Sequence, residues 1–131
     1  SREGENDVRH RYSSVQGTAE FSMNGTFSVR FQPGAWAKEH ERSYEDASQS
    51  CLERIDFQGT LISSESGERP GQTVLTYYQN WEGTPLFSCQ VTLLWQDDTL
   101  LRMEGQRLSG TITSRKRPSL PPQSWSVFWP V

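Results

Sequence analysis

Apolar residues alternate with polar ones along much of the chain, which is the pattern of half-buried β-strands. Two short alternating runs flank Asn24-Gly25, a dipeptide typical of tight hairpin turns because both turn positions favour positive φ. The longest run extends from Pro85 to Gln96. Its expected inward residues are Phe87, Cys89, Val91, Leu93 and Trp95. The pattern therefore predicts antiparallel strands that bury one face.

Between Trp36 and Ile55 the hydrophobic period changes from that of a strand to that of a helix. The residues at helical spacing are Tyr44, Ala47, Ser48, Cys51, Leu52 and Ile55. Ser43, followed three residues later by Asp46, is similar to a capping box. Acidic residues in a first turn also stabilise a helix by interacting with the positive end of its dipole. We predict one amphipathic helix in this region.

The order of hairpin, helix and four further strands predicts an α+β fold, with a single amphipathic helix packed on a curved antiparallel sheet. We assign this domain to residues 18–113. Residues 1–17 are charged and polar without a period, so we expect a flexible linker there. Residues 114–131 are rich in Pro and Trp and are expected to form a tail, in which 125–129 could add an edge strand.

The composition supports one compact domain without a strong electric field. The chain has 131 residues, a net charge of −3, and five Trp, six Phe and four Tyr that supply a core. Acidic and basic residues are interspersed, so we expect no binding to nucleic acid. No apolar run is long enough to span a bilayer, and the chain starts at Ser1 without a leader pattern. We expect attachment to a membrane only through an N-terminal anchor preceding Ser1.

The ionisable residues do not form a recognisable catalytic or metal-binding motif. His10 and His40 lack the spacing of known metal sites. The pair Asp97-Asp98 is typical of a hairpin turn, and the pair Glu45-Asp46 is typical of a helix start. Each pair therefore has a structural explanation that does not require an acid–base role. We therefore expect no enzymatic activity, no cofactor and no metal. An enzyme with a small substrate would have to use Tyr77, Tyr78, Asp97 and His40, which no motif joins.

Cys51 and Cys89 both fall on surfaces that are expected to meet, one on the helix and one on the long strand. A disulfide between them is compatible with an oxidising compartment. Two unpaired buried thiols that pack as small hydrophobic groups are equally compatible with the pattern. A reactive nucleophile is the least favoured alternative, because burial raises the pKa of a thiol.

The tryptophans are the remaining binding candidates. Trp95 alternates with core residues and is expected inside. Trp36 and Trp81 lie at the ends of expected elements, and Trp125 and Trp129 lie in the tail. Each could anchor a partner, although large aromatic side chains more often close the end of a sheet.

The helix ending in "CLERIDFQGTLIS" and the segment "TVLTYYQNWEGTPLFSCQVTLLWQDDTLLRMEGQRLSG" resemble the extracytoplasmic modules of YycI/YycH-type two-component regulatory proteins. The resemblance covers residues 36–112, and it extends to PepSY-like and cystatin-like domains. It implies a non-catalytic regulatory domain outside a Gram-positive cell, anchored in the membrane or secreted. The implied partner is a cell-envelope protein such as a sensor histidine kinase.

A second class of function is inhibition of a secreted hydrolase, a protease or a lysozyme, because hairpin loops can enter a cleft. The loops that would do so are "NWEGT" and "QDDT". A regulator and an inhibitor differ in what precedes Ser1, since an anchor helix favours the regulator and a cleavable leader favours the inhibitor.

Overall fold

The computed structural model describes residues 9–22 and 24–107, which form an α+β fold with one helix packed on a seven-stranded antiparallel sheet. The strands are β1 (Arg9–Ser14), β2 (Gly17–Ser22), β3 (Thr26–Phe31), β4 (Gly59–Ser66), β5 (Gln72–Trp81), β6 (Thr84–Gln96) and β7 (Thr99–Gln106). The helix, α2 (Tyr44–Glu53), lies between β3 and β4 in the chain. This architecture confirms the predicted fold class at the level of one helix on an antiparallel sheet.

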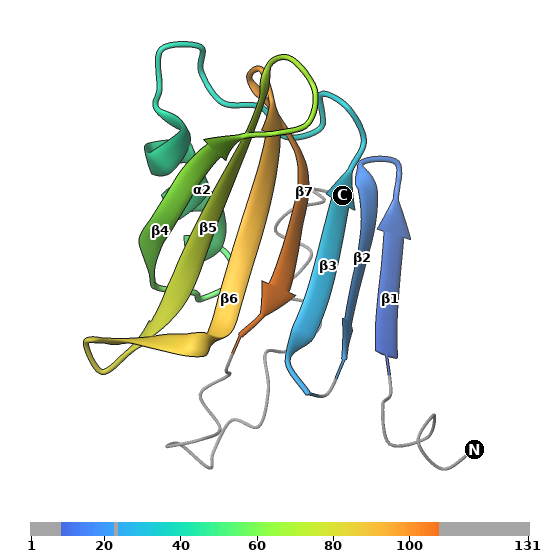
Figure 1. Cartoon of the computed structure of the whole chain (residues 1–131). Coiled ribbons are helices and arrows are strands. Elements are labelled where there is room, and N and C mark those ends of the chain that lie inside the picture. The colour runs from blue at the N-terminus through green and yellow to red at the C-terminus, as the bar shows by residue number, and fades with distance from the viewer. Residues whose placement is uncertain (1–8, 23, 108–131) are drawn as a thin grey trace.

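The position of the helix follows from the strand order β1-β2-β3-β7-β6-β5-β4. β3 is an inner strand and β4 is the edge strand four places away, so the connection between them has to cross the sheet. α2 makes this crossing on one face, behind the sheet in the view of Figure 1. No helix covers the other face, which is turned toward the viewer, within the described part of the chain.

The core lies between the sheet and the connection that contains α2. Cross-strand register aligns one fully buried residue from each of five neighbouring strands in a single row. That row is Ala19, Val29, Met103, Leu93 and Leu75. Because neighbouring strands align these apolar side chains on one face, a slip of one residue in any strand would expose its part of the core.

The predicted start of the helix is confirmed. Ser43 adopts an extended conformation, and its hydroxyl accepts a hydrogen bond of 3.0 Å from the backbone N–H of Asp46. This bond satisfies one of the backbone donors that a helix start leaves without a partner. The predicted stripe is buried at Ala47, Ser48, Cys51 and Leu52.

Residues 9–17 differ from the expected linker, because Arg9–Ser14 form β1 and Gly17 starts β2. β1 pairs with β2 through a tight turn in which Ser14 is opposite Gly17. The Arg11 guanidinium also lies 3.1 Å from a carboxylate oxygen of Glu20. The strand has no hydrophobic alternation because it is an edge held by backbone pairing and charge, and such pairing leaves no periodic signal in the sequence. The expected tail at 114–131 lies outside the described residues.

The hairpin at Asn24-Gly25 is confirmed, since Phe21 pairs with Phe27 and the Gly25 N–H donates to the Ser22 carbonyl at 3.1 Å. The Asn24 side chain accepts a hydrogen bond of 3.1 Å from the Thr26 backbone N–H, which stabilises the turn.

One face assignment in β6 is wrong. Phe87 was expected in the core, but 78% of it is exposed. The pairing with β5 jumps from Tyr78 opposite Gln90 to Gln79 opposite Leu86. This irregularity leaves residues 87–89 without a register partner on β5, and the alternation of buried and exposed residues that holds from Cys89 onward does not extend to Phe87.

Candidate partner-binding site

The β5–β6 hairpin projects beyond the strands on either side of it. β4 pairs with β5 only as far as Gln79, and β7 pairs with β6 only as far as Val91. The hairpin continues through Trp81 opposite Thr84 and is the yellow segment at the lower left of Figure 1. Glu82 and Gly83 at its tip both have positive φ, 52° and 85°, as a two-residue turn of type I′ requires.

The hairpin carries an exposed aromatic pair on the sheet face opposite α2. The rings of Tyr78 and Phe87 lie with their centroids 5.3 Å apart and their planes tilted by 57°. Tyr78 is half-buried, whereas most of Phe87 faces solvent. An exposed Phe that packs against a half-buried ring offers an apolar contact, and aromatic side chains of this kind dominate the binding energy of many interfaces.

The four tryptophan candidates differ in their positions and contacts in the structure. Trp81 is half-buried near the tip of the projecting hairpin. Trp36 packs against the core, with Phe31 at 6.3 Å between ring centroids and the Arg54 guanidinium 5.3 Å from its ring. Trp36 therefore closes an end of the sheet rather than presenting a free ring. Trp125 and Trp129 lie outside the described residues.

Trp95 is fully buried, as the sequence predicted. Sequence reasoning missed the exposed aromatic residue, Phe87, because strict alternation assigned it to the core. The Gly-x-Pro segment at residues 83–85 was the available signal, since Pro cannot donate a backbone hydrogen bond and favours the irregular end of a strand.

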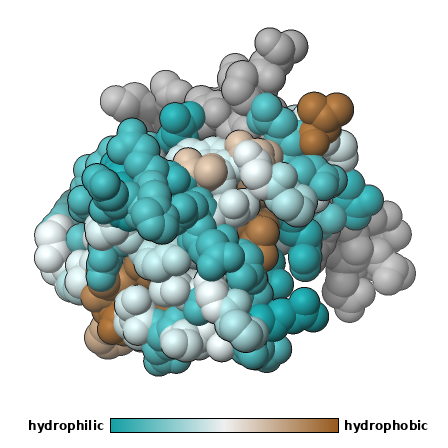
Figure 2. Space-filling view, turned by 90° about the horizontal axis from the view of Figure 1, so that it is seen from above, coloured by the Kyte–Doolittle hydropathy of each residue, from teal (hydrophilic) through white to brown (hydrophobic). Residues whose placement is uncertain are grey.

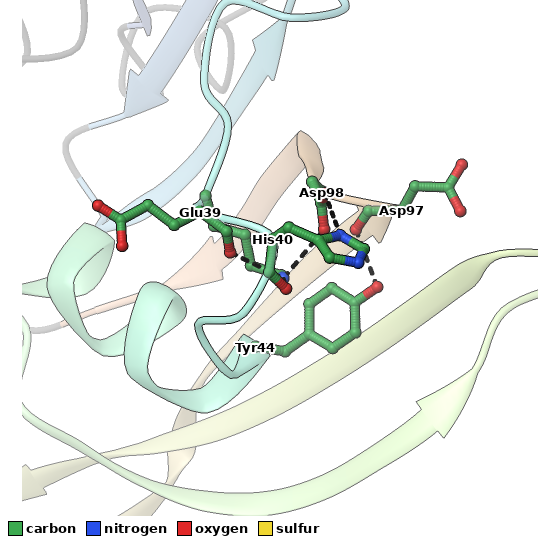
Figure 3. Close-up of polar contacts among 6 residues, drawn as sticks. Glu39, His40, Tyr44, Asp97 and Asp98 are labelled. Carbon is green, nitrogen blue, oxygen red and sulfur yellow. Dashed lines mark hydrogen bonds and ion pairs between the residues drawn. The ribbon is translucent and has the colours of Figure 1, made fainter.

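A polar cluster lies at the opposite end of β6, where the connection between β3 and α2 meets the β6–β7 turn (Figure 3). The Lys38 ammonium lies 3.0 Å from one carboxylate oxygen of Asp98, and His40 Nδ1 lies 2.9 Å from the other. The Tyr44 hydroxyl donates a hydrogen bond of 2.8 Å to the Asp97 carbonyl. Figure 2 looks down on this end of the molecule, where the surface is mostly hydrophilic and hydrophobic residues lie in separate small patches.

The geometry of this cluster favours a structural role. Only 4% of the Lys38 side chain is exposed, and its ammonium also donates to the backbone carbonyls of Glu39 and His40 at 3.3 Å. Hydrogen bonds from His40 and Lys38 lower the pKa of Asp98. Within residues 9–22 and 24–107, the Asp98 carboxylate is hydrogen-bonded to His40 and to Lys38. In the same residues, neither His40 nor Asp98 forms a side-chain hydrogen bond with a hydroxyl or thiol that could act as a nucleophile. The cluster therefore fixes the connection to the turn.

The four residues named for a small-substrate enzyme do not form one site. His40 and Asp97 lie at the end with the polar cluster. Tyr77 is buried on the helix side, where its hydroxyl approaches the Glu45 carbonyl at 3.4 Å, and burial raises its pKa to about 12. Tyr78 lies on the other face, beside Phe87.

The two loops expected to enter the cleft of a hydrolase also lie apart. One follows Trp81 and the other follows Gln96, at opposite ends of the 13-residue strand β6. A strand of that length spans about 40 Å. The two loops therefore form separate surfaces at opposite ends of the sheet.

Cys51 and Cys89 are free thiols, and both are buried. The Cys51 thiol points to the Met103 sulfur at 3.8 Å, and burial raises its pKa. The structure thus has the second of the two arrangements that the sequence left open, in which both residues pack as small hydrophobic groups.

Among the described residues, no group of three or more His, Cys, Asp or Glu side chains could hold a metal ion. The same part of the chain contains no helix with the length and apolar character of a membrane span. Comparison of the chain with protein-family models, with curated proteins and with solved structures finds no match.

Proposed function

We propose that this chain is a non-catalytic protein-binding domain that contacts its partner through the β5–β6 hairpin. The observation that carries this proposal is the position of Phe87, which is 78% exposed and packs against the tilted ring of Tyr78. Burying a Phe side chain contributes about 1.5 to 3 kcal/mol. The exposed ring therefore provides an apolar contact that the fold itself does not use.

The proposed partner is a protein of the cell envelope, such as the extracellular part of a sensor histidine kinase. This part of the proposal rests on the resemblance to YycI/YycH-type regulatory proteins, which includes the hairpin sequence at residues 77–87. The assignment to the cystatin-like or PepSY-like class belongs to the same proposal, and one helix on an antiparallel sheet is consistent with it. An extracytoplasmic location, anchored or secreted, follows from that assignment.

The test places a photo-crosslinking amino acid at Glu82 in the hairpin tip of the protein expressed in its own cells. We expect a crosslinked adduct with an envelope protein, which mass spectrometry would identify. The affinity of that purified partner for the wild-type chain and for Phe87→Ser is then compared. Loss of the aromatic contact should weaken binding about tenfold or more.

Val15→Ser is the matched control, because Val15 is 91% exposed in the β1–β2 turn at the other end of the molecule. We expect it to bind like the wild-type chain. An adduct whose affinity does not depend on Phe87, or the absence of any adduct at Glu82, would contradict the proposal.

A further inference from the structure

The sheet face opposite α2 carries two arginines directly opposite each other. Alternate residues of β3 are buried in the core, so Ser28 and Arg30 lie on the other face. Arg30 pairs in register with Arg102 of β7, and Met103, beside it, is buried. Both arginines therefore project from the open face that is turned toward the viewer in Figure 1.

Two glutamates lie next to this arginine pair, and each already has its own arginine. Ser28 is two residues from Arg30 on the same face, and its register partners are Glu20 on β2 and Glu104 on β7. The Arg11 guanidinium lies 3.1 Å from Glu20. Similarly, the Arg102 guanidinium lies 3.6 Å from Glu104.

In the described ranges, Arg30 is therefore the one arginine beside Glu20 and Glu104 that neither glutamate pairs with. It is exposed, and its guanidinium forms no ion pair or hydrogen bond with another residue in the part of the chain that the structure describes. Like charges directly opposite each other on neighbouring strands destabilise a sheet. An anion bound between Arg30 and Arg102 would remove this repulsion, and a guanidinium holds a carboxylate with two parallel hydrogen bonds.

We propose that Arg30 and Arg102 bind the carboxylate of an Asp or Glu side chain in an extended segment of the partner protein. The glutamates beside the pair disfavour a polyanion or a doubly charged phosphate and suit a single carboxylate. The next positions in the same cross-strand row are Leu94 and Val74, both half-buried. The partner segment therefore combines an acidic residue with apolar neighbours. The inference rests on the proposed protein-binding function and names the chemistry of the partner.

The test uses a capped hexapeptide of Val and Thr with one central Glu, and the same peptide with Gln in its place. Each is titrated into the ¹⁵N-labelled chain while the arginine side-chain Nε–Hε resonances are followed by NMR. We expect the Glu peptide to shift the resonances of Arg30 and Arg102 and the Gln peptide to bind about tenfold more weakly or not at all. Inorganic phosphate should shift them less than the Glu peptide.

Arg30→Gln should weaken binding of the Glu peptide about tenfold, whereas Arg69→Gln, which removes an exposed arginine from the β4–β5 loop, should not. Equal binding of the two peptides, stronger binding of phosphate, or equal effects of the two variants would overturn the assignment. The peptide titration and the crosslinking experiment test the two proposals separately. If the Glu peptide binds at Arg30 but Phe87→Ser does not change the affinity for the partner, the proposed role of the hairpin is refuted and the carboxylate site is not. The reverse pattern refutes the carboxylate site alone.

Discussion

At the scale of single residues, a fully buried polar contact joins α2 to the sheet. The Trp95 indole N–H donates a hydrogen bond of 2.9 Å to the Ser48 hydroxyl, and both residues are fully buried. Ser48 lies on the apolar stripe of the helix, where its spacing alone does not show why a hydroxyl is present. The buried indole explains it, because a buried donor without an acceptor is costly.

We expect Ser48→Ala to lower the free energy of unfolding by about 1 to 3 kcal/mol, because it leaves the indole N–H of Trp95 without an acceptor in the core. Urea denaturation followed by tryptophan fluorescence measures the difference. Ser66→Ala, at an exposed position of β4, is the control and should change stability by less than about 0.5 kcal/mol. Equal stabilities of the two variants would show that the buried hydroxyl of Ser48 contributes nothing to stability.

At the scale of elements, the connection between β3 and α2 is fixed to the β6–β7 turn by backbone and side-chain contacts together. The Leu100 N–H donates to the Trp36 carbonyl and the Lys38 N–H to the Asp98 carbonyl, each at 2.8 Å. The Asp98 carboxylate adds the contacts to Lys38 and His40. This attachment positions α2, because the helix starts at Tyr44, only a few residues after the anchored segment.

Asp98→Asn should lower the thermal midpoint at neutral pH, and the difference from wild type should shrink in acid. Hydrogen bonds from His40 and Lys38 hold the pKa of Asp98 below that of an unfolded aspartate, about 3.9. The carboxylate therefore stabilises the fold above that pH, and the contribution is lost as the pH falls through the lower folded-state pKa. Calorimetry from pH 7 to pH 2 measures this change.

Asp97→Asn is the matched control, since Asp97 has a positive φ of 54° that Asn tolerates and its backbone carbonyl, not its carboxylate, accepts from Tyr44. It should remain close to wild type at every pH. A constant difference between Asp98→Asn and wild type across the pH range would contradict the assigned role of the charge.

The sequence predicted those elements whose pattern reflects burial. The helical stripe and the alternation from Cys89 to Trp95 correspond to side chains that are buried in the core. β1 was missed because an edge strand requires backbone partners rather than a buried face. Phe87 was misplaced because the register changes where β6 leaves its neighbours, and register depends on the partner strand.

The binding surface was predictable only in part for a related reason. The turn at Glu82-Gly83 is visible in the sequence as a Gly-containing turn between two strands. Its projection is not visible, because it depends on where β4 and β7 stop pairing. The arginine pair likewise joins residues 30 and 102, which only the strand order β3-β7 brings together.

At the scale of the whole molecule, the two cysteines report whether the core opens as a unit. Cys51 lies on the helix and Cys89 on the longest strand, with 0% and 2% of each exposed. A thiol reagent reaches them only when the structure opens, and burial raises the pKa of Cys51, which lowers its thiolate fraction further.

We expect the native chain to react slowly with a disulfide-exchange reagent, and the chain unfolded in denaturant without reductant to react rapidly at both thiols. Each thiol is measured in a variant in which the other cysteine is replaced by Ser. If helix and sheet separate only on global unfolding, Cys51 and Cys89 will be protected from the reagent to the same extent. Val15→Cys, at a position that is 91% exposed, should react at once and controls for the reagent. If the unfolded protein does not react with the reagent, Cys51 and Cys89 form a disulfide, which would contradict the free thiols of the structure. Much faster labelling of Cys89 than of Cys51 would show that the hairpin end opens on its own, and the binding surface would then belong to a separately mobile part of the fold.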